Sequence, residues 1–280
     1  MVNADVSKGV GQPQASGQWT AGQKALLQQI LRFRRDRIVE SAAARPVQLE
    51  GEDEAYAMQD ALAARLRRKL AGWKVGAYYD TSVQRALGLS QPFYGRVFAA
   101  DLRRSPAVLK PAKYPACHVE AELALEIAED IPAGSAPVDI GGMAKLVAGV
   151  LPVFEVVTST WDNRNLLSGL DHVADNGGCG GLVAGKPIKA WAEIDLRQQH
   201  VQLRVDGQLA VERQIAVGWQ EVLGAAAWLV NRLKARGVGI EAGQIIAAGT
   251  LTGLTPVGSG QTAEAYFGHF GKVRMSIAHA

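Results

Sequence analysis

Apolar residues follow helical spacing in the first part of the chain and a shorter, strand-like spacing after it. From about Ala21 to Ala44, large apolar side chains recur near helical spacing, and Arg45-Pro46 ends the pattern. A second helix is predicted from about Glu52 to Ala71, where one stripe carries Ala55, Met58, Leu62, Leu66 and Leu70. Residues 21–72 are therefore predicted to form an N-terminal helical region that is appended to the rest of the chain.

From residue 73 onward the pattern changes to short segments typical of β-strands, separated by glycine, proline and asparagine. These segments are WKVGAYY, YGRVFAA, HVEAELALEIA, LVAGVLPVFEVV, GGLVAG, DLRQQHVQLRVDG and KVRMSIA. One helix is predicted among them, from about Trp219 to Arg236. Strands that do not alternate regularly with helices argue against a parallel sheet of strand-helix-strand units. The predicted fold class is α+β, with a β-rich roll or sandwich over residues 73–280.

The composition fits one large domain, or one domain with an appendage. The chain has 280 residues and a mass of 29.8 kDa, and 48% hydrophobic residues are ample for a sizeable core. The formal net charge of +3 is close to neutral for this length. The basic clusters RFRRDR and RLRRK fall within the predicted helices and lack interleaved aromatic residues. We therefore expect solvated helix faces there, and no nucleic-acid partner.

Cysteine usage and the lack of long apolar runs indicate the compartment. Cys117 and Cys179 form neither a CxxC pair nor a disulfide framework, which favours a reducing environment. No apolar run reaches the roughly 18 residues of a membrane span, and no charged-then-apolar start indicates a signal peptide. We expect a cytoplasmic protein with no membrane partner. Residues 1–20, rich in Gly, Ser, Gln and Asn, are predicted to be a disordered tail.

The segment EAELALE, residues 120–126, places three carboxylates in a run that is otherwise alanine and leucine. Apolar residues alternate there with the period of a strand. A helix is the alternative, because these residue types favour helices, but like charges at Glu122 and Glu126 would repel in it. In a strand, Glu120 and Glu122 share one face with Cα atoms roughly 7 Å apart and can converge on one cation. A solvated acidic face is the other interpretation of an isolated Glu-x-Glu.

Glu155 is the third candidate ligand, and it is flanked by apolar residues in the segment LPVFEVVTS. An ionised carboxylate in such a strand costs several kcal/mol unless it is paired or bound to a metal. Three glutamates from two strands, with water completing the coordination shell, are a common way to build a Mg²⁺ or Mn²⁺ site. The sequence therefore predicts that Glu120, Glu122 and Glu155 bind one such ion. A salt bridge from Glu155 to an arginine or lysine is the alternative.

Two further segments offer groups for an anionic ligand. Lys74 lies mid-strand in GWKVG, where an ammonium either pairs with the glutamates or binds an anionic substrate near the metal. Taken alone it would be an ordinary ion-pair lysine. The segment GQIIAAGTLTGLTPVG runs from a buried strand into a loop whose amides and hydroxyls can hold a carboxylate, at Gly249, Thr250, Thr252 and Gly253. Taken alone this loop would be only a turn.

Several common motifs of catalysis and nucleotide binding do not occur in the chain. No P-loop, GxSxG or HExxH motif occurs, and GSGQTA at Gly258 lacks the strand-turn-helix setting of a dinucleotide fingerprint. The five histidines are dispersed, and each is predicted to be structural. His118 differs only in lying two residues before Glu120, on the same predicted strand face.

Seven motifs, taken in order, carry a resemblance to a known family: EAYAMQ, GWKVG, QPFYGRVF, EAELALE, FEVVTS, DHVADNGGCGGLVAG and AAGTLTGLTPV. They resemble the fumarylacetoacetate hydrolase superfamily, in its branch of 2-keto-4-pentenoate hydratases and 4-oxalocrotonate decarboxylases. The motifs cover nearly everything after the tail, and their order and spacing together are specific. The resemblance implies a mixed β-sandwich roll that assembles as a homo-oligomer and acts in aromatic catabolism.

The resemblance also implies roles for single residues. It implies a Mg²⁺ or Mn²⁺ ion held by Glu120, Glu122 and Glu155, with a 2-oxo acid chelating the ion through its carboxylate and keto oxygens. The ion would act as a Lewis acid in a lyase reaction, either water addition after tautomerisation of a dienol or decarboxylation. Lys74 matches the active-site lysine of the family. The positions that match its substrate-binding segments are Phe93, Tyr94, Ser159, Asn176, Thr250 and Thr252.

Three departures from the family motifs leave the activity open. Hydratases usually show an acidic residue in QPDYG, which can shuttle a proton, but this chain has Phe93. The run Glu-Val-Val-Asp-Ser-Arg becomes EVVTST, with Thr158 and Thr160 in place of Asp and Arg. The motif DNAS becomes Asp-Asn-Gly-Gly at residues 175–178. The metal ligands are retained while the proton-transfer and pocket residues are changed.

Two interpretations fit these departures. The chain is either an enzyme for a bulkier or less polar substrate, or a non-catalytic subunit that keeps the scaffold and metal and associates with a related hydratase or decarboxylase. Hydrolysis of an acylpyruvate is a third possibility, but it needs a His and Glu pair to activate water. No such pair is evident near the metal motifs.

Overall fold

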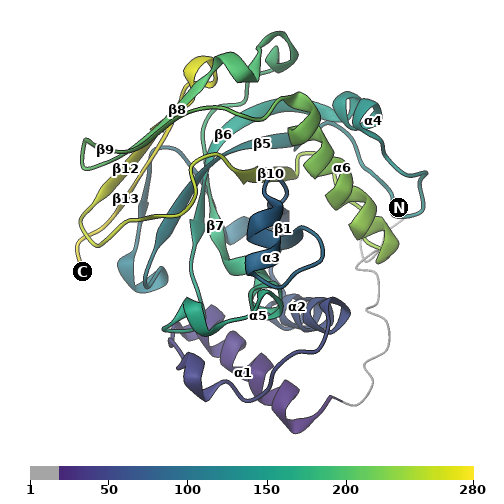
Figure 1. Cartoon of the computed structure of the whole chain (residues 1–280), viewed down its shortest axis with the longest axis vertical. Coiled ribbons are helices and arrows are strands. Elements are labelled where there is room, and N and C mark those ends of the chain that lie inside the picture. The colour runs from purple at the N-terminus through teal and green to yellow at the C-terminus, as the bar shows by residue number, and fades with distance from the viewer. Residues whose placement is uncertain (1–18) are drawn as a thin grey trace, which may run out of the picture.

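The computed structural model describes residues 19–280, which form two mixed β-sheets with helices around them (Figure 1). The predicted tail lies outside this range, except for its last two residues. The α-helices are α1 (Ala21–Asp36), α2 (Glu52–Leu66), α3 (Thr81–Ala86), α4 (Ile140–Lys145), α5 (Gly169–Ala174) and α6 (Trp219–Ala235). The strands are β1 (Leu70–Gly76), β2 (Phe93–Phe98), β3 (Leu102–Arg104), β4 (Ala107–Leu109), β5 (His118–Ile127), β6 (Val147–Val157), β7 (Cys179–Ala184), β8 (His200–Val205), β9 (Gln208–Gln214), β10 (Ile245–Thr250), β11 (Thr255–Pro256), β12 (Thr262–Tyr266) and β13 (Lys272–Ile277).

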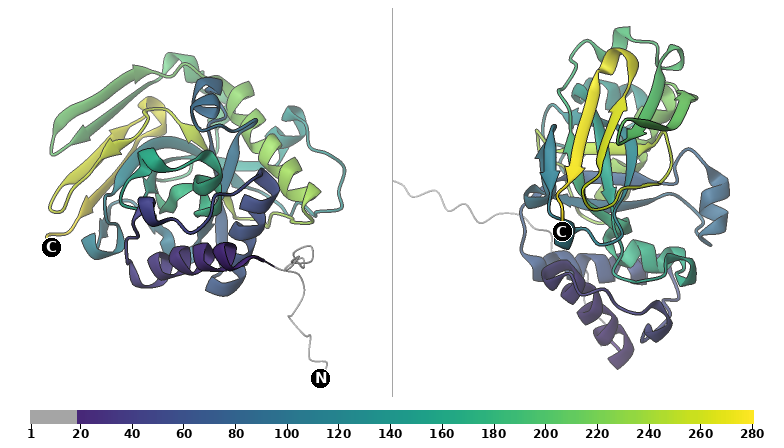
Figure 2. Two further views of the ribbon diagram at one scale, coloured as in Figure 1. Left: turned by 60° about the horizontal axis from the view of Figure 1, so that its bottom comes forward. Right: turned by 90° about the vertical axis from the view of Figure 1, so that its left-hand side faces the viewer.

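The larger sheet has eight strands in the order β2-β1-β10-β5-β6-β7-β3, and β11 extends it by pairing with β5. The pairs β1–β10 and β3–β7 are parallel and the others are antiparallel. The smaller sheet has five strands in the order β4-β13-β12-β8-β9, and its β13 packs on β6 and β7 (Figure 2). The predicted α+β class, with mixed sheets and N-terminal helices, is confirmed.

One face of the larger sheet, here called the inner face, changes from apolar to acidic along β5. Ala124 of β5 is aligned with Ala247 of β10 and Leu151 of β6, and these side chains belong to a small buried apolar cluster. Two and four residues earlier on the same face of β5 stand Glu122 and Glu120. The opposite face carries the main core, where α6 packs on β1 and β10. Most residues of β5 are therefore buried, whichever face of the sheet their side chains occupy.

The first helix is shorter than predicted. Its apolar spacing was expected to continue to Ala44, but α1 ends at Asp36 because Arg37 adopts a left-handed conformation, with φ of 62°. The next residues are not helical, a 3₁₀ helix covers Ala42–Ala44, and Glu40 forms an isolated bridge with Trp161. That pairing with a distant segment replaces the last turns of the predicted helix.

The second helix also ends early. The prediction to Ala71 is wrong beyond Leu66, because Arg67 has φ of 50° and stops the helix. Leu70, which helical spacing placed on the apolar stripe, is instead the first residue of β1 and pairs with Phe98 of β2. Within residues 19–280, no helix combines the length and the apolar character needed to cross a membrane.

Most predicted strands are confirmed, with corrections at their ends. The segment of residues 73–79 stops being a strand at Gly76, since Ala77 has φ of 59° and turns the chain toward α3. The segment of residues 195–207 becomes a strand only at His200. The predicted helix from Trp219 is confirmed as α6, but it is not alone, because α3, α4 and α5 are six-residue helices that the pattern did not reveal.

The N-terminal helices are joined to the sheet through a buried polar cluster as well as by apolar packing. Arg34 of α1, 5% exposed, forms an ion pair of 2.6 Å with Asp175 and donates a hydrogen bond of 2.6 Å to the carbonyl of Cys179. Asp175 also accepts a hydrogen bond of 2.8 Å from the N–H of Thr160. Because an unpaired buried charge is costly, this cluster holds the segments after β6 and before β7 in place.

Candidate metal centre and active site

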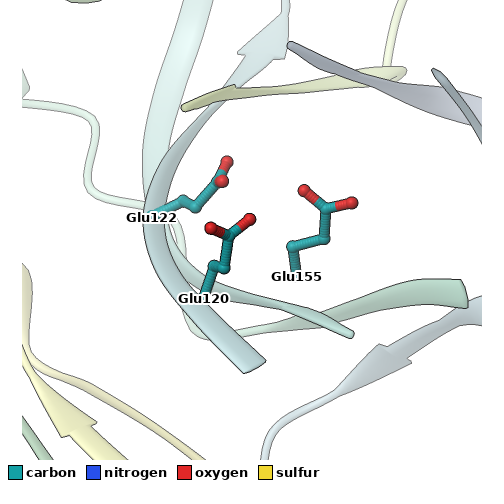
Figure 3. A group of neighbouring side chains, drawn as sticks. All are labelled: Glu120, Glu122 and Glu155. Carbon is teal, nitrogen blue, oxygen red and sulfur yellow. The ribbon is translucent and has the colours of Figure 1, made fainter. Parts of the chain in front are cut away.

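Glu120 and Glu122 of β5 and Glu155 of β6 come together on the inner face of the larger sheet (Figure 3). Glu120 and Glu155 are directly opposite each other in the antiparallel pair. One carboxylate oxygen of each of the three residues lies within 4.8 Å of those of the other two. The strand interpretation of EAELALE is confirmed, and the structure brings together the three predicted metal ligands.

The three carboxyl groups are held in surroundings that disfavour their charge. Glu122 and Glu155 are each 1% exposed. Burial is the largest cause that raises the pKa of each of the three, and the charge of Glu155 adds to it for Glu120 and Glu122. The pKa of Glu120 rises to about 7 and that of Glu122 rises well above its usual value. Without a cation, the cluster therefore retains protons that exposed glutamates would lose.

Lys74 reaches the cluster from β1, which is separated from β5 only by β10. Its Nζ lies 3.5 Å from Oε1 of Glu155, and the side chain is 3% exposed. The positive charge lowers the pKa of all three glutamates and so opposes the effect of burial. One ammonium cannot balance three carboxylates, which leaves the cluster short of positive charge.

The donor set fits a divalent metal ion. Oε1 of Glu155 is buried and has no hydrogen-bond partner among the described residues, while Oε2 of Glu122 accepts one hydrogen bond of 3.1 Å from the N–H of Gly249. The candidate ligands are all carboxylate oxygens, which hard cations prefer. Lys74 lies outside the ligand set because an ammonium has only protons to donate. The three glutamates would hold the ion, and Lys74 would remain free for a substrate.

The raised pKa of Glu120 predicts how pH affects the stability of the metal-free protein. A carboxyl group with a folded pKa of about 7 binds its proton more strongly in the folded state than in the unfolded state. Its contribution to stability is therefore present below the unfolded pKa, near the usual 4.5, and is lost as the pH rises through about 7. We expect the thermal midpoint measured in EDTA to fall over this window, and Mg²⁺ to restore it more strongly at the upper end.

The matched control for this pH effect is Glu120→Gln, which cannot lose a proton there. The variant should show a smaller fall in the thermal midpoint across the same window. Equal slopes for the variant and the wild type would contradict the assignment.

An aromatic ring covers Lys74. The centroid of the Phe93 ring lies 4.4 Å from Nζ of Lys74, within the range of a cation–π contact. Two glycines make room for this ring. A Cβ on Gly76 would lie 2.4 Å from the Phe93 ring, and a Cβ on Gly177 would lie 2.7 Å from Cε of Lys74 and 3.2 Å from the Phe93 ring. The change from acid to phenylalanine and the change from DNAS to Asp-Asn-Gly-Gly are thus linked by packing.

The loop after β10 is held by its own hydroxyl groups. Oγ1 of Thr250 accepts hydrogen bonds from the N–H groups of Gly253 and Thr252, at 2.9 and 3.3 Å. Oγ1 of Thr252 accepts one of 3.0 Å from the N–H of Ala121 in β5. Two of the amides predicted to hold a carboxylate are therefore used within the loop. The Thr250 hydroxyl stands beside Glu120, whose pKa it helps to lower, and the roles of both threonines toward a substrate stay predictions.

The structure does not bring Tyr94 to the glutamate cluster. Adjacent residues of a strand point to opposite faces, so Tyr94 lies on the face of β2 away from Phe93. Its ring stacks on that of Tyr56 with centroids 4.3 Å apart, and it is 1% exposed. The side chain is part of the main core.

Asn176 and Ser159 are close to the site in sequence, but their side chains serve the backbone. The side-chain amide of Asn176 accepts a hydrogen bond of 2.7 Å from the backbone N–H of Arg96 and donates one of 2.8 Å to the backbone carbonyl of Arg96. Oγ of Ser159 accepts a hydrogen bond of 3.1 Å from the N–H of Trp161. Both residues shape the walls of the site, and a substrate contact by either stays a prediction.

The fold adds three side chains that the motifs did not single out. Tyr79 is half-buried, and desolvation of its hydroxyl followed by the charge of Glu122 raises the pKa of this phenol. His172 of α5 is half-buried, and its pKa falls to about 3 through desolvation and then the charges of Arg164 and Lys74. Its imidazole is therefore neutral near neutral pH. Arg164 belongs to the segment between β6 and α5, and its charge lowers the pKa of Glu120.

The sequence around these three residues contains no motif that would predict their place near the glutamate cluster. His172 stands inside the motif DHVADN, yet nothing in that motif reveals that the charges of Arg164 and Lys74 act on its ring. The neighbouring charges that act on His172 are those of two cations. Among the described residues, His172 therefore does not form the His and Glu pair that hydrolysis would require.

A family model for the fumarylacetoacetate (FAA) hydrolase C-terminal domain matches residues 85–278. The chain belongs to the fumarylacetoacetate hydrolase C-terminal family. The resemblance predicted from the seven motifs is thereby confirmed. The three glutamates of this family member lie within the matched region, while Lys74 and the helices α1 and α2 precede it.

Relatives of this family member include hydratases from two bacteria. It is 29% identical over 228 residues to 2-keto-4-pentenoate hydratase of Paraburkholderia phymatum, covering 80% of this chain and 85% of the relative. It is 31% identical over 195 residues to 2-hydroxyhexa-2,4-dienoate hydratase of Comamonas testosteroni, and this match covers 69% of this chain and 72% of the relative. The fold also matches a solved structure of 4-oxalocrotonate decarboxylase from Pseudomonas putida G7, which is complexed with magnesium and adipate. The TM-score is 0.81 and the sequence identity is 22%, and the match covers 91% of this chain and 97% of the decarboxylase chain. The curated relatives, which also include a 4-oxalocrotonate decarboxylase of Pseudomonas putida with 27% identity over 207 residues, support a lyase of the hydratase or decarboxylase type.

Proposed function

We propose that the protein is a divalent-metal-dependent lyase that adds water to a 2-oxo acid substrate, presented as its 2-hydroxydienoate tautomer. The observation that carries this proposal is the buried cluster of Glu120, Glu122 and Glu155, with Nζ of Lys74 3.5 Å from Glu155. The hydratases among its relatives support the reaction class. Mg²⁺ or Mn²⁺ is the proposed ion, because both bind carboxylate oxygens and retain water ligands that a substrate can displace.

The residues of the chain bind and orient the substrate. When bound, the metal ion supplies a Lewis acid that polarises the carboxylate and keto oxygens of the 2-oxo acid. Lys74 places a positive charge and three donor protons beside that position, where negative charge grows on the enol oxygen. Phe93 covers the other side of the ammonium and keeps water from it. Because water has little access to this site, the effective dielectric constant is low and the electrostatic effect of Lys74 is larger than in water.

Hydration also requires proton transfer, which Phe93 cannot perform. A proton must reach a carbon of the dienol, and water must add to the far end of the conjugated system. Among the described residues, the groups near the cluster that carry a transferable proton include the buried Lys74 ammonium, the Tyr79 hydroxyl and the His172 imidazole. We assign proton transfer to these groups, in place of the acidic residue that hydratases of the family usually have at the position of Phe93.

Decarboxylation is the second candidate reaction, and Phe93 favours it. When CO₂ is lost from the far carboxylate of an unsaturated 2-oxo diacid such as 4-oxalocrotonate, the electron pair of the broken bond would move to the same polarised keto oxygen. That reaction needs no activated water, so an apolar ring beside Lys74 costs it less. The proposal extends to a homo-oligomer, as the resemblance implies. A non-catalytic subunit that keeps the metal and associates with a related hydratase or decarboxylase is the remaining alternative.

Turnover of dienol substrates tests the proposal. We expect the absorbance of 2-hydroxypenta-2,4-dienoate or 4-oxalocrotonate to fall in the presence of Mg²⁺ or Mn²⁺, and to stay constant with EDTA. Mass spectrometry of the product separates the added water from the lost CO₂. Metal binding without turnover of either compound would contradict an enzyme of this substrate class and favour the partner-subunit alternative.

A further inference from the structure

Arg164 lies beside the glutamate cluster without a partner for its charge. It begins a short 3₁₀ helix, Arg164–Leu166, between β6 and α5. Its Nη1 is buried and has no hydrogen-bond partner within residues 19–280. None of the ion pairs in this part of the chain includes it. A guanidinium is charged at any ordinary pH, so a buried unpaired nitrogen marks a position where an anion would bind favourably.

The guanidinium of Arg164 and the ammonium of Lys74 lie against neighbouring glycines of the segment between α5 and β7. A Cβ on Gly177 would lie 3.1 Å from Nζ of Lys74, and a Cβ on Gly178 would lie 4.0 Å from Nη2 of Arg164. The two cations therefore face successive residues of one segment. The charge of Arg164 also lowers the pKa of Glu120, which places it near the metal ligands without an ion pair to them.

The segment that carries Arg164 is held on the side of the N-terminal helices. Glu40 donates its N–H to the carbonyl of Thr160 at 2.8 Å and accepts a hydrogen bond of 2.9 Å from the N–H of Asp162. The Asp162 carboxylate in turn accepts a hydrogen bond of 2.9 Å from the N–H of Ala42. These contacts fix the backbone just before Arg164, so the side chain enters the site from a defined position.

We propose that Arg164 binds a second carboxylate, at the end of the substrate remote from the 2-oxo acid group. This inference rests on the proposed function, which assigns the 2-oxo acid group to the metal ligands and Lys74. A guanidinium suits this role because its parallel N–H groups match a carboxylate in two hydrogen bonds. The substrate class that follows is a 2-oxo dicarboxylic acid with an apolar middle, which lies along Gly177 and Gly178 and past the ring of Phe93.

Two saturated 2-oxo acids that differ only in the distal carboxylate test this proposal. We would measure binding of 2-oxoheptanedioate and of 2-oxoheptanoate by titration calorimetry with saturating Mg²⁺. The wild type is expected to bind the dicarboxylate about 10- to 100-fold more tightly, as hydrogen bonds to charged groups contribute. Arg164→Met should remove this preference and leave the affinity for 2-oxoheptanoate within about twofold. Arg164→Lys should retain part of the preference, and the exposed Arg85→Met is the matched control that should retain all of it.

The outcomes separate this inference from the proposed function. A preference for the dicarboxylate that survives Arg164→Met would overturn the role of Arg164 alone. An equal loss of both affinities in Arg164→Met would do the same, since the residue would then serve the shared 2-oxo acid end or the loop. If the wild type binds neither acid with the metal present, the proposed function fails and this inference fails with it. Should Arg164→Met not fold, the comparison of Arg164→Lys with wild type decides.

Discussion

Replacing Glu155 with glutamine is expected to abolish divalent-metal binding and to lower kcat/KM by about 10³-fold or more, because Lewis-acid stabilisation supplies several kcal/mol. Glutamine has nearly the same shape but no charge, so the cluster loses one of only three anionic ligands. Glu155 lies opposite Glu120 in the strand pair, and among the described residues the metal-ligand cluster contains no further carboxylate that could replace it. Calorimetric titration with Mg²⁺ and initial rates on a dienol substrate measure the two effects.

Glu126→Gln is the matched control for this experiment. Glu126 stands on the same strand and the same face as Glu120 and Glu122, but it is paired with Ile245 and Gly149 at the other end of β5. Metal binding and turnover should be unchanged in this variant. Glu120→Gln should behave like Glu155→Gln. Retained turnover in either ligand variant would falsify the metal-dependent mechanism.

Replacing Lys74 with methionine is expected to lower kcat by about 10²- to 10⁴-fold while Mg²⁺ still binds, since proton transfer and charge stabilisation by one group contribute on that scale. Methionine keeps most of the apolar stem and removes the ammonium that lies 3.5 Å from Glu155. The three carboxylates remain in place, so the metal site persists. The separation of metal affinity from kcat is what distinguishes a substrate-binding ammonium from a purely structural ion pair.

The control for Lys74→Met is the same substitution at Lys69, which is exposed just before β1. It removes an equal charge from a neighbouring position and should leave both measurements unchanged. In the absence of metal, Lys74→Met should also melt at a lower temperature, because Glu155 loses the cation that opposes its burial. Wild-type kcat in Lys74→Met would show that the ammonium serves only as a counter-charge.

The metal ligands could be predicted from sequence because their signal is local. In β5 the strand period alone puts Glu120 and Glu122 on one face, and an acid among valines and phenylalanine marks Glu155 as a residue that needs a cation. Helix ends could not be predicted in the same way. Arg37 and Arg67 end α1 and α2 in left-handed conformations that arginine does not favour, so tertiary packing imposes them.

The sequence by itself determined the type of the main elements, the three glutamates and the family motifs, since each depends on residues close together in the chain. The family motifs also led us to expect Lys74 and Phe93 at this site, but only the tertiary structure decided how these two side chains reach the glutamates and which further side chains join them. β10, from near the C-terminus, inserts between β1 and β5, and this strand order brings Lys74 to the glutamates. Phe93, Arg164 and His172 arrive from three further segments. The reason is physical: strand order and long-range packing set these contacts, and no local period of the sequence encodes them.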